Sequence, residues 1–174
     1  GFGRLGQMFA ANVAGVTPDI ITLGKALTGG ITPLAATVAS ARVYDAFHSD
    51  DAAKALMHGP TYMGHALGCA AANASLDLFE REPRLDEVAA IEAHLLATLL
   101  PLKDSPRVAD VRIRGSVGAV DMRNGFDLQK TRRDFIEQSV FIRPIGKTIY
   151  LAPSYTIPMD DLSRLTAAIV NFAA

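Results

Sequence analysis

Cysteine is nearly absent from this sequence, and that absence limits the class of protein. Cys69 is the only cysteine among 174 residues, so no intrachain disulfide can form. Small secreted domains that rely on several disulfides are therefore excluded, and the single thiol fits a reducing, cytoplasmic location. The four histidines are scattered, and ligand pairs such as HExxH or CxxC are missing. We therefore expect no metal site.

Long apolar runs and an excess of charge of one sign are missing as well. Glycine, proline or a charged residue interrupts each apolar stretch well before the roughly 18 residues that a membrane-spanning helix needs. Lysine and arginine total 17 against 18 acidic residues, and no basic stripe stands out. Nucleic acid and anionic membrane are therefore poor candidates as partners.

What remains is the composition of a packed globular protein. Apolar residues make up 49% of the chain and charged residues 20%, which separates it from disordered segments. The chain opens in the middle of a motif with glycine instead of an initiator methionine, and we interpret it as part of a longer protein. Pro83, inside the polar stretch 81–84, marks the expected boundary between residues 1–82 and residues 83–174.

Hydrophobic periodicity predicts a mixed α/β chain. In the first part, a β-branched run that ends in glycine predicts a buried strand, and an alanine-rich stretch predicts a long helix with Thr61 as its N-cap. The expected elements are strand 19–24, turn 26–30, strand 34–40, a short helix at 42–47 and a long helix at 62–81.

The second part predicts a small α+β unit. Apolar residues recur at helical spacing from 88 to 99, before a proline. Two apolar runs flank Gly115 and Ser116, and a two-residue loop of this kind predicts a hairpin. The expected elements are helix 88–99, strands 108–114 and 117–122, a helix around 128–136, strands 140–142 and 148–151, and a closing helix over 162–172.

The first six residues, GFGRLG, match a dinucleotide-binding fingerprint letter for letter. That motif needs a preceding strand, and an acidic residue about 20 positions later at the end of a second strand. No residue precedes Gly1, and Asp19 begins an expected strand instead of ending one. A glycine-rich turn is therefore the better interpretation.

Lys25 stands directly after an apolar strand and before the turn at Gly29 and Gly30. Burying an ammonium group is costly, so a lysine beside the core tends toward its neutral, nucleophilic form, as Schiff-base chemistry requires. A lysine whose stem only lies along the edge of a sheet is the alternative, and position alone leaves both open.

Gly59, Pro60 and Thr61 stand at the start of the expected long helix. Backbone amides, the positive end of the helix dipole and a hydroxyl meet there, which suits a phosphate, although any capped helix offers the same groups. Together with Lys25, they outline a phosphate-bearing aldehyde cofactor that is held by a lysine.

Arg143 follows a short expected strand and precedes Pro144 and a glycine turn at Gly146. A guanidinium held in one direction suits bidentate capture of a carboxylate. A surface arginine paired with an acidic residue is the alternative, and the sequence leaves both open.

Three segments resemble the class III aminotransferases of the fold-type I pyridoxal-phosphate superfamily: PDIITLGKALTGG at 18–30, HGPTYMGHALGCAAANASL at 58–76 and RPIGKTIYLAPSY at 143–155. The resemblance covers essentially the whole chain and corresponds to the family's C-terminal portion. The lysine motif is shared by the class, whereas the other two segments are more typical of the branch that serves biotin biosynthesis. The implied fold is α/β: the end of the cofactor-binding large domain in residues 1–82, then a small α+β domain in residues 83–174.

The resemblance also implies roles for single residues. Lys25 would carry pyridoxal 5′-phosphate as a Schiff base and act as the catalytic residue. Thr61, with Gly59 and Pro60 in the same loop, would bind the cofactor phosphate of the partner subunit in a homodimer. Arg143 would hold the carboxylate of the keto-acid substrate.

Two further positions of the substrate site follow from the same resemblance. Arg4 matches an arginine near the active site, and Gly59 also belongs to the loop beside the substrate. Leu5 stands where many members have threonine, which alters the expected contacts of Arg4.

The implied reaction is amino transfer from an amine donor, adenosylmethionine in the biotin branch, to 8-amino-7-oxononanoate, which gives 7,8-diaminononanoate. In the family, the acid that pairs with the pyridine nitrogen and the aromatic that stacks on the ring precede Gly1, so we expect the 174 residues to be inactive alone. Another class III ω-amino-acid transaminase, or a non-catalytic dimerisation fragment of this fold, are the alternatives.

Overall fold

The computed structural model describes residues 1–174, and their contacts divide the chain into two compact units. One unit consists of Gly1–Phe2 and Phe9–Pro83, and the other of Gly3–Met8 and Arg84–Ala174. The short segment Gly3–Met8 therefore packs with the second unit, although it lies at the start of the sequence. None of the helices combines the length and the apolar content that crossing a membrane requires.

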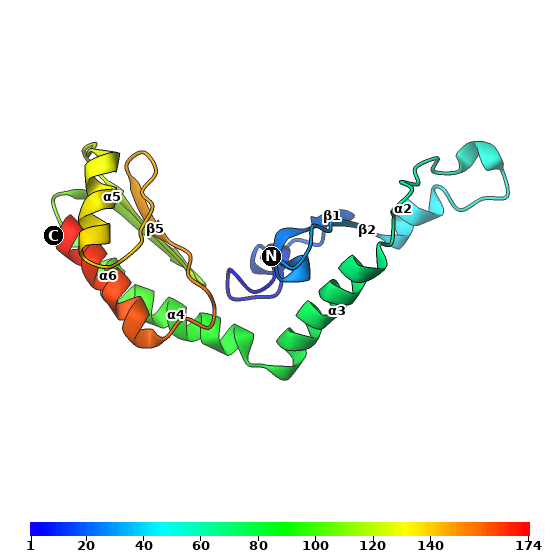
Figure 1. Ribbon diagram of the computed structural model, residues 1–174. Helices are drawn as coiled ribbons and strands as arrows, with labels where there is room; N and C mark the ends of the chain where they lie inside the picture. Colours follow the sequence, from blue (N-terminus) through cyan, green and yellow to red (C-terminus); the bar gives the residue numbers. More distant parts are fainter. The chain divides into compact units, whose positions relative to one another are not determined.

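The first unit pairs two short strands and carries a long helix (Figure 1). Strands β1 and β2 are antiparallel, with Ile20 opposite Ala39. Leu27 and Ala72 are buried where the 3₁₀ helix η1 packs against α3. In chain order, the elements are α1 (Ala10–Val13), β1 (Ile20–Leu23), η1 (Lys25–Thr28), β2 (Ala36–Ala39), α2 (Ala41–Asp45), η2 (Ala52–Lys54) and α3 (Ala66–Arg81).

The expected burial of the first strand is wrong. Residues of β1 alternate between exposed and half-buried, and Ile20 is 54% exposed. The reason is the size of the sheet: β1 and β2 pair only with each other, and a two-stranded ribbon cannot enclose its own faces.

The expected start of the long helix is wrong as well. Helix α3 begins at Ala66, and its N-cap is His65, whose Nδ1 accepts a 3.1 Å hydrogen bond from the amide of Gly68. Thr61 instead belongs to a turn over 61–64, which ends at Gly64 with φ 71°. Because this left-handed conformation is incompatible with a continuous helix, the helix starts only after it.

The second unit is a three-stranded antiparallel sheet with helices packed against it. The sheet has the order β3–β4–β5, and the hairpin between β3 and β4 pairs Arg114 with Val117, as the two-residue loop predicted. Its elements are α4 (Arg84–Leu99), η3 (Leu100–Asp104), β3 (Val108–Arg114), β4 (Val117–Met122), α5 (Leu128–Glu137), β5 (Thr148–Leu151) and α6 (Met159–Ala173).

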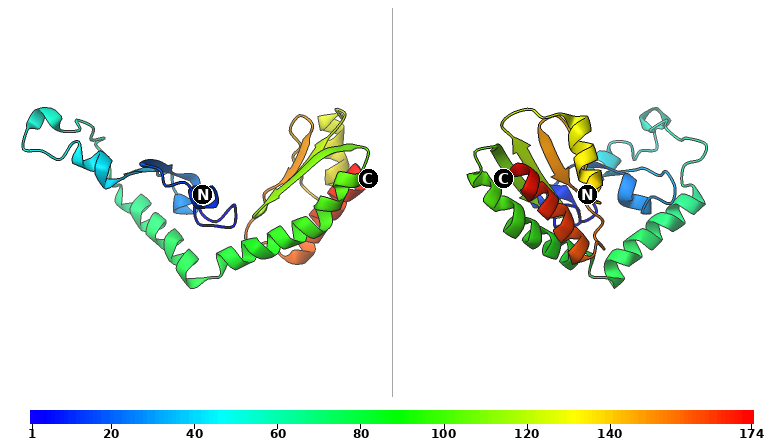
Figure 2. Two further views of the ribbon diagram at one scale, coloured as in Figure 1. Left: turned by 180° about the vertical axis from the view of Figure 1, so that it is seen from behind. Right: turned by 60° about the vertical axis from the view of Figure 1, so that its left-hand side comes forward.

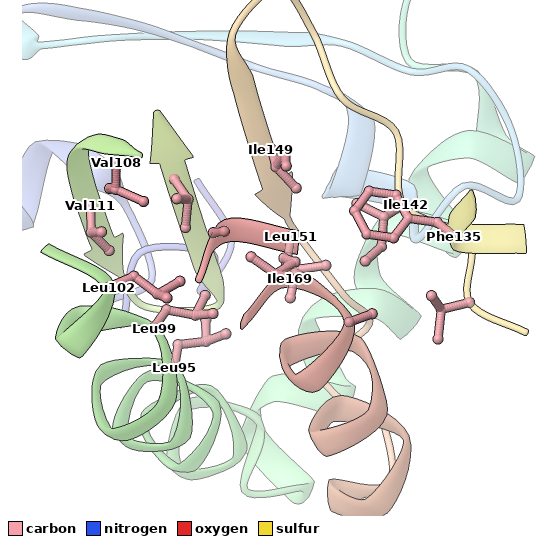
Figure 3. Close-up of a cluster of buried hydrophobic side chains, with 14 of the residues drawn as sticks. Leu95, Leu99, Leu102, Val108, Val111, Phe135, Ile142, Ile149, Leu151 and Ile169 are labelled. Atoms are coloured by element: carbon pink, nitrogen blue, oxygen red, sulfur yellow. The ribbon is translucent and has the colours of Figure 1, made fainter. Parts of the chain in front are cut away.

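One apolar core lies between this sheet and its helices. Helices α4 and α6, green and red in Figure 2, run side by side, and both contribute side chains to the cluster in Figure 3. Gly118 on β4 allows a close approach, because a Cβ there would lie 3.2 Å from Leu99. The core residues labelled in Figure 3 are Leu95, Leu99, Leu102, Val108, Val111, Phe135, Ile142, Ile149, Leu151 and Ile169.

The strand expected at 140–142 does not form. Val140 and Ile142 are both buried, but this stretch pairs with no strand of the sheet. Its apolar residues fill the core from an extended connection, so they produce a strand-like pattern without strand pairing.

Candidate functional site

Lys25 lies at a strained point of the backbone, as the first residue of η1 and two residues after the end of β1. Its φ is 51°, a left-handed value that is rare outside glycine. The amide of Leu27 donates a 3.1 Å hydrogen bond to the carbonyl of Gly24 and so closes the turn around Lys25. Strained residues of this kind persist only where the surroundings hold them, and they cluster at functional sites.

Two side chains hold this turn. Thr28 is 2% exposed, and its hydroxyl donates a 2.6 Å hydrogen bond to the carbonyl of Thr32. Ser75 on α3 donates a 3.2 Å hydrogen bond to the carbonyl of Ala26. The residues after Lys25 are therefore tied both to the following loop and to the long helix.

A cavity of about 610 Å³ opens beside Lys25. Of the two placements that the sequence left open for Lys25, the exposed one is found, and the side chain forms no hydrogen bond or ion pair within the chain. Its amine is therefore accessible to a ligand in this cavity. The lining consists of Gly24, Lys25, Thr28, Gly30, Thr32, Pro33, Leu34 and Ala35.

Gly59, Pro60 and Thr61 do not line this cavity. All three are exposed, and the carbonyl of Pro60 accepts a 2.9 Å hydrogen bond from the amide of Met63. The chain therefore brings Lys25 and this loop into the same unit but not into the same cavity, and the assignment of the loop to the cofactor phosphate stays a prediction.

A second cavity, of about 260 Å³, lies in the second unit and carries Arg143. Arg143 is exposed and has no partner within the chain, and no strand precedes it, contrary to expectation. Six of its eight lining residues are apolar, and the polar side chains are a guanidinium and a phenol. Its lining consists of Phe141, Ile142, Arg143, Tyr150, Leu151, Ala152, Pro153 and Leu165.

Arg4 also belongs to the second unit, where it has partners in the turn between β3 and β4 and in the segment after β5. Its Nη1 donates to the hydroxyl of Ser116 at 2.9 Å and to the carbonyl of Pro153 at 2.6 Å. The guanidinium carbon lies 4.6 Å from the centre of the Tyr155 ring, a cation–π contact. Arg4 is thus engaged within the chain, whereas Lys25 and Arg143 are not.

Sequence reasoning missed the residues that hold these groups in place. These residues contact partners that are far away in the sequence: Ser75 is 49 residues from Ala26, and Ser116 is 112 residues from Arg4. Tyr155 likewise contacts the distant Arg4. Only the Gly115-Ser116 turn carried a local signal, and that signal indicated a hairpin and not a partner for Arg4.

The chain is similar to known proteins over nearly its whole length. Residues 1–172 match the family Aminotransferase class-III. The adenosylmethionine-8-amino-7-oxononanoate aminotransferase of Buchnera aphidicola (subsp. Acyrthosiphon pisum) is 42% identical over 171 residues, which cover 98% of this chain and 40% of that protein. The chain spans about 40% of the length of the curated relatives that it matches.

Solved structures of aminotransferases are also similar to this chain. The enzyme with that name from Methanocaldococcus jannaschii has a TM-score of 0.85 and 32% identity, over 98% of this chain and 43% of that one. An amine transaminase from an uncultivated Pseudomonas species, solved with pyridoxal phosphate bound, has a TM-score of 0.86 and 35% identity, over 98% and 41%. The predicted fold class, that of the fold-type I transaminases, is confirmed. The chain belongs to the class III aminotransferases.

Proposed function

We propose that the protein containing this chain is a pyridoxal-phosphate-dependent aminotransferase that converts 8-amino-7-oxononanoate to 7,8-diaminononanoate with adenosylmethionine as the amine donor. The observation that carries the proposal is the free amine of Lys25, held by a left-handed turn beside a cavity of about 610 Å³. The names of the relatives support the choice of substrates.

The residues around Lys25 fit pyridoxal phosphate. An aldehyde cofactor needs an accessible lysine amine, and Lys25 is exposed and without a partner in the chain. Gly24 and Gly30 line the cavity without side chains, so a planar ring can approach the backbone closely. When bound, this cofactor supplies an aldehyde carbon that reacts with amines and a pyridine ring that withdraws electrons from the reacting carbon.

Lys25 has two tasks in this proposal. Its Nζ would hold the cofactor covalently until an amine substrate displaces it. The released Nζ would then take a proton from the substrate Cα as a general base and deliver it to the aldehyde-derived carbon of the cofactor as a general acid. The hydrogen bonds of Thr28 and Ser75 orient the turn that carries Lys25 during both steps.

Arg143 binds the acceptor in this proposal. A keto acid such as 8-amino-7-oxononanoate combines an aliphatic chain with a terminal carboxylate. The cavity of about 260 Å³ offers apolar walls from Ile142, Leu151 and Leu165 for the chain, and the unpaired guanidinium of Arg143 for the carboxylate. Burial of the aliphatic chain and pairing of the carboxylate together orient the acceptor within this cavity.

The remaining parts of the proposal rest on the family resemblance. Thr61, with Gly59 and Pro60, binds the cofactor phosphate across a homodimer interface. Residues 1–82 belong to the cofactor-binding large domain and residues 83–174 to the small C-terminal domain. The single cysteine fits a cytoplasmic location.

A donor comparison tests the proposal. The purified protein is incubated with pyridoxal phosphate and 8-amino-7-oxononanoate, together with either adenosylmethionine or an ω-amino acid, and 7,8-diaminononanoate is measured by mass spectrometry. We expect product with adenosylmethionine. Product only with the ω-amino acid would indicate a general ω-transaminase, and no product with any donor would indicate a non-catalytic member of the fold.

A further inference from the structure

The turn between β3 and β4 is packed directly against the segment Gly3–Met8. Gly115 has φ 54°, and a Cβ added there would lie 2.6 Å from the carbonyl carbon of Leu5 and 2.7 Å from the nitrogen of Gly6, with the carbonyl oxygen of Arg4 closer still. Real Cβ atoms do not approach backbone this closely. Glycine is therefore required at 115 for two independent reasons, the left-handed conformation and the contact itself.

Ser116, the next residue, is fully buried and binds Arg4 through both backbone and side chain. Its amide donates a 3.0 Å hydrogen bond to the carbonyl of Arg4, and its hydroxyl accepts one of 2.9 Å from Arg4 Nη1. Leaving one of these groups unpaired in the interior would be costly, so the hairpin turn fixes both ends of Arg4.

Arg4 in turn holds the segment that follows β5. Its Nη1 reaches the carbonyl of Pro153, and its guanidinium lies over the ring of Tyr155. Burial raises the pKa of the Tyr155 phenol, while the charge of Arg4 lowers it, so the ring stays neutral near pH 7 and offers its face to the guanidinium. Pro153 is also a wall of the cavity that carries Arg143.

We propose that Arg4 is a positioning residue for the carboxylate pocket of Arg143, and that Gly115 and Ser116 hold it in that position. Arg4 fixes Pro153, and Pro153 limits the space in which a ligand chain can lie beside Arg143. This assignment differs from a direct contact between Arg4 and the substrate, because the hydrogen bonds found for its guanidinium go to residues of the chain itself. It rests on the proposed role of Arg143.

The test compares two acceptors in the complete enzyme, the keto acid and a short neutral aldehyde that has no carboxylate. Ser116→Ala removes the hydrogen bonds of the Ser116 hydroxyl with Arg4, and it should raise KM for the keto acid by roughly 2- to 10-fold, with little change in kcat or in KM for the aldehyde. Gly115→Ala should have at least this effect. The matched controls are Ser163→Ala, an exposed serine that bonds only to its own helix, and Gly125→Ala, where a Cβ meets no atom within 4 Å.

Binding of heptanoate, measured by calorimetry, gives a second readout that does not depend on turnover. Its Kd should rise in Ser116→Ala by a factor similar to that of the keto-acid KM, while both controls retain the parent value. If Gly115→Ala fails to fold, the result for Ser116→Ala alone tests the positioning role of Arg4.

Arg143→Ala separates failure of this inference from failure of the proposed function. If Arg143→Ala removes the preference for the keto acid but Ser116→Ala leaves it intact, the positioning role of Arg4 is wrong. If Arg143→Ala also leaves the preference intact, the carboxylate pocket itself is wrongly assigned. Equal losses with both acceptors in Ser116→Ala would indicate general destabilisation, and would likewise overturn the positioning role.

Discussion

The hydroxyl of Ser75 on α3 donates a 3.2 Å hydrogen bond to the carbonyl of Ala26, the residue that follows Lys25. The same carbonyl accepts a 3.0 Å hydrogen bond from the amide of Gly29. Helix α3 therefore supports the turn that holds Lys25 at its left-handed φ.

Ser75→Ala removes this support, and we expect it to lower the free energy of unfolding by about 0.5–1.5 kcal/mol. It should also weaken retention of pyridoxal phosphate, because the strained turn loses a restraint. Urea denaturation and dialysis against buffer without cofactor measure the two effects. Asn73→Ala, at an exposed position of the same helix, is the control. Identical behaviour of the two variants would contradict the support by Ser75.

His65 and Thr61 should respond differently to substitution, because only His65 caps α3. His65→Ala is expected to cost about 1 kcal/mol of stability, the usual effect of a lost N-cap. Thr61→Ala should leave the unfolding free energy unchanged within about 0.5 kcal/mol, as an exposed position without partners does. It should instead weaken cofactor binding by roughly 1.5–3 kcal/mol if its hydroxyl binds the phosphate. Chemical denaturation and cofactor titration of both variants separate the two roles; a Thr61→Ala protein that keeps the cofactor as tightly as the parent would count against the phosphate role.

Arg143→Ala should raise KM for 8-amino-7-oxononanoate by an amount equivalent to roughly 1.5–3 kcal/mol of lost binding. Arg143→Lys should raise it less, because lysine keeps the charge but lacks the planar guanidinium that forms two hydrogen bonds with a carboxylate. The half-reaction with the amine donor should change less. Stopped-flow measurement of each half-reaction distinguishes the two, with Arg123→Ala as an exposed control. Collapse of the donor half-reaction instead would mean that Arg143 holds a different carboxylate.

The sheet carries an acid-sensitive ion pair. The Arg112 guanidinium, and after it the Thr148 hydroxyl, hold the pKa of the Asp121 carboxyl below its ordinary value. A lowered pKa in the folded state means that the stabilisation is complete above the ordinary value and is lost as the pH falls through the lowered one. Asp121→Asn should therefore lower Tm most above about pH 5, and the difference from the parent should shrink below about pH 4.

Thermal unfolding followed by circular dichroism across this pH range checks the pH dependence of Asp121. Asp104→Asn, on the exposed surface of η3, is the control and should show no comparable trend. A difference between Asp121→Asn and the parent that stays constant down to pH 3 would contradict the ion-pair interpretation.

The sequence predicted those parts of the fold whose causes are local. The Gly115-Ser116 turn marked the hairpin because a two-residue loop leaves little freedom in strand pairing. The apolar spacing of residues 88–99 marked α4 because its buried side chains share one helix face. The apolar run at 140–142 led to the wrong prediction of a strand, since burial against a core and pairing in a sheet favour the same residue types.

The sequence predicted which residues form the candidate site, but it did not predict how these residues are arranged in space. Lys25 stood out by its place between an apolar strand and two glycines, but its exposure and its left-handed backbone depend on pairing and packing that no local pattern encodes. The same holds for Arg4, whose partners Ser116 and Pro153 lie more than a hundred residues away in the chain.

The most direct test of the account is the identity of the lysine that binds the cofactor. The protein loaded with pyridoxal phosphate is reduced with borohydride, digested and mapped by mass spectrometry. We predict that the cofactor mass lies on the peptide containing Lys25, and that Lys25→Ala, with an unchanged circular dichroism spectrum, carries no label and transfers no amino group. Labelling of any other lysine in the parent, or amino transfer by a folded Lys25→Ala protein, would contradict the account.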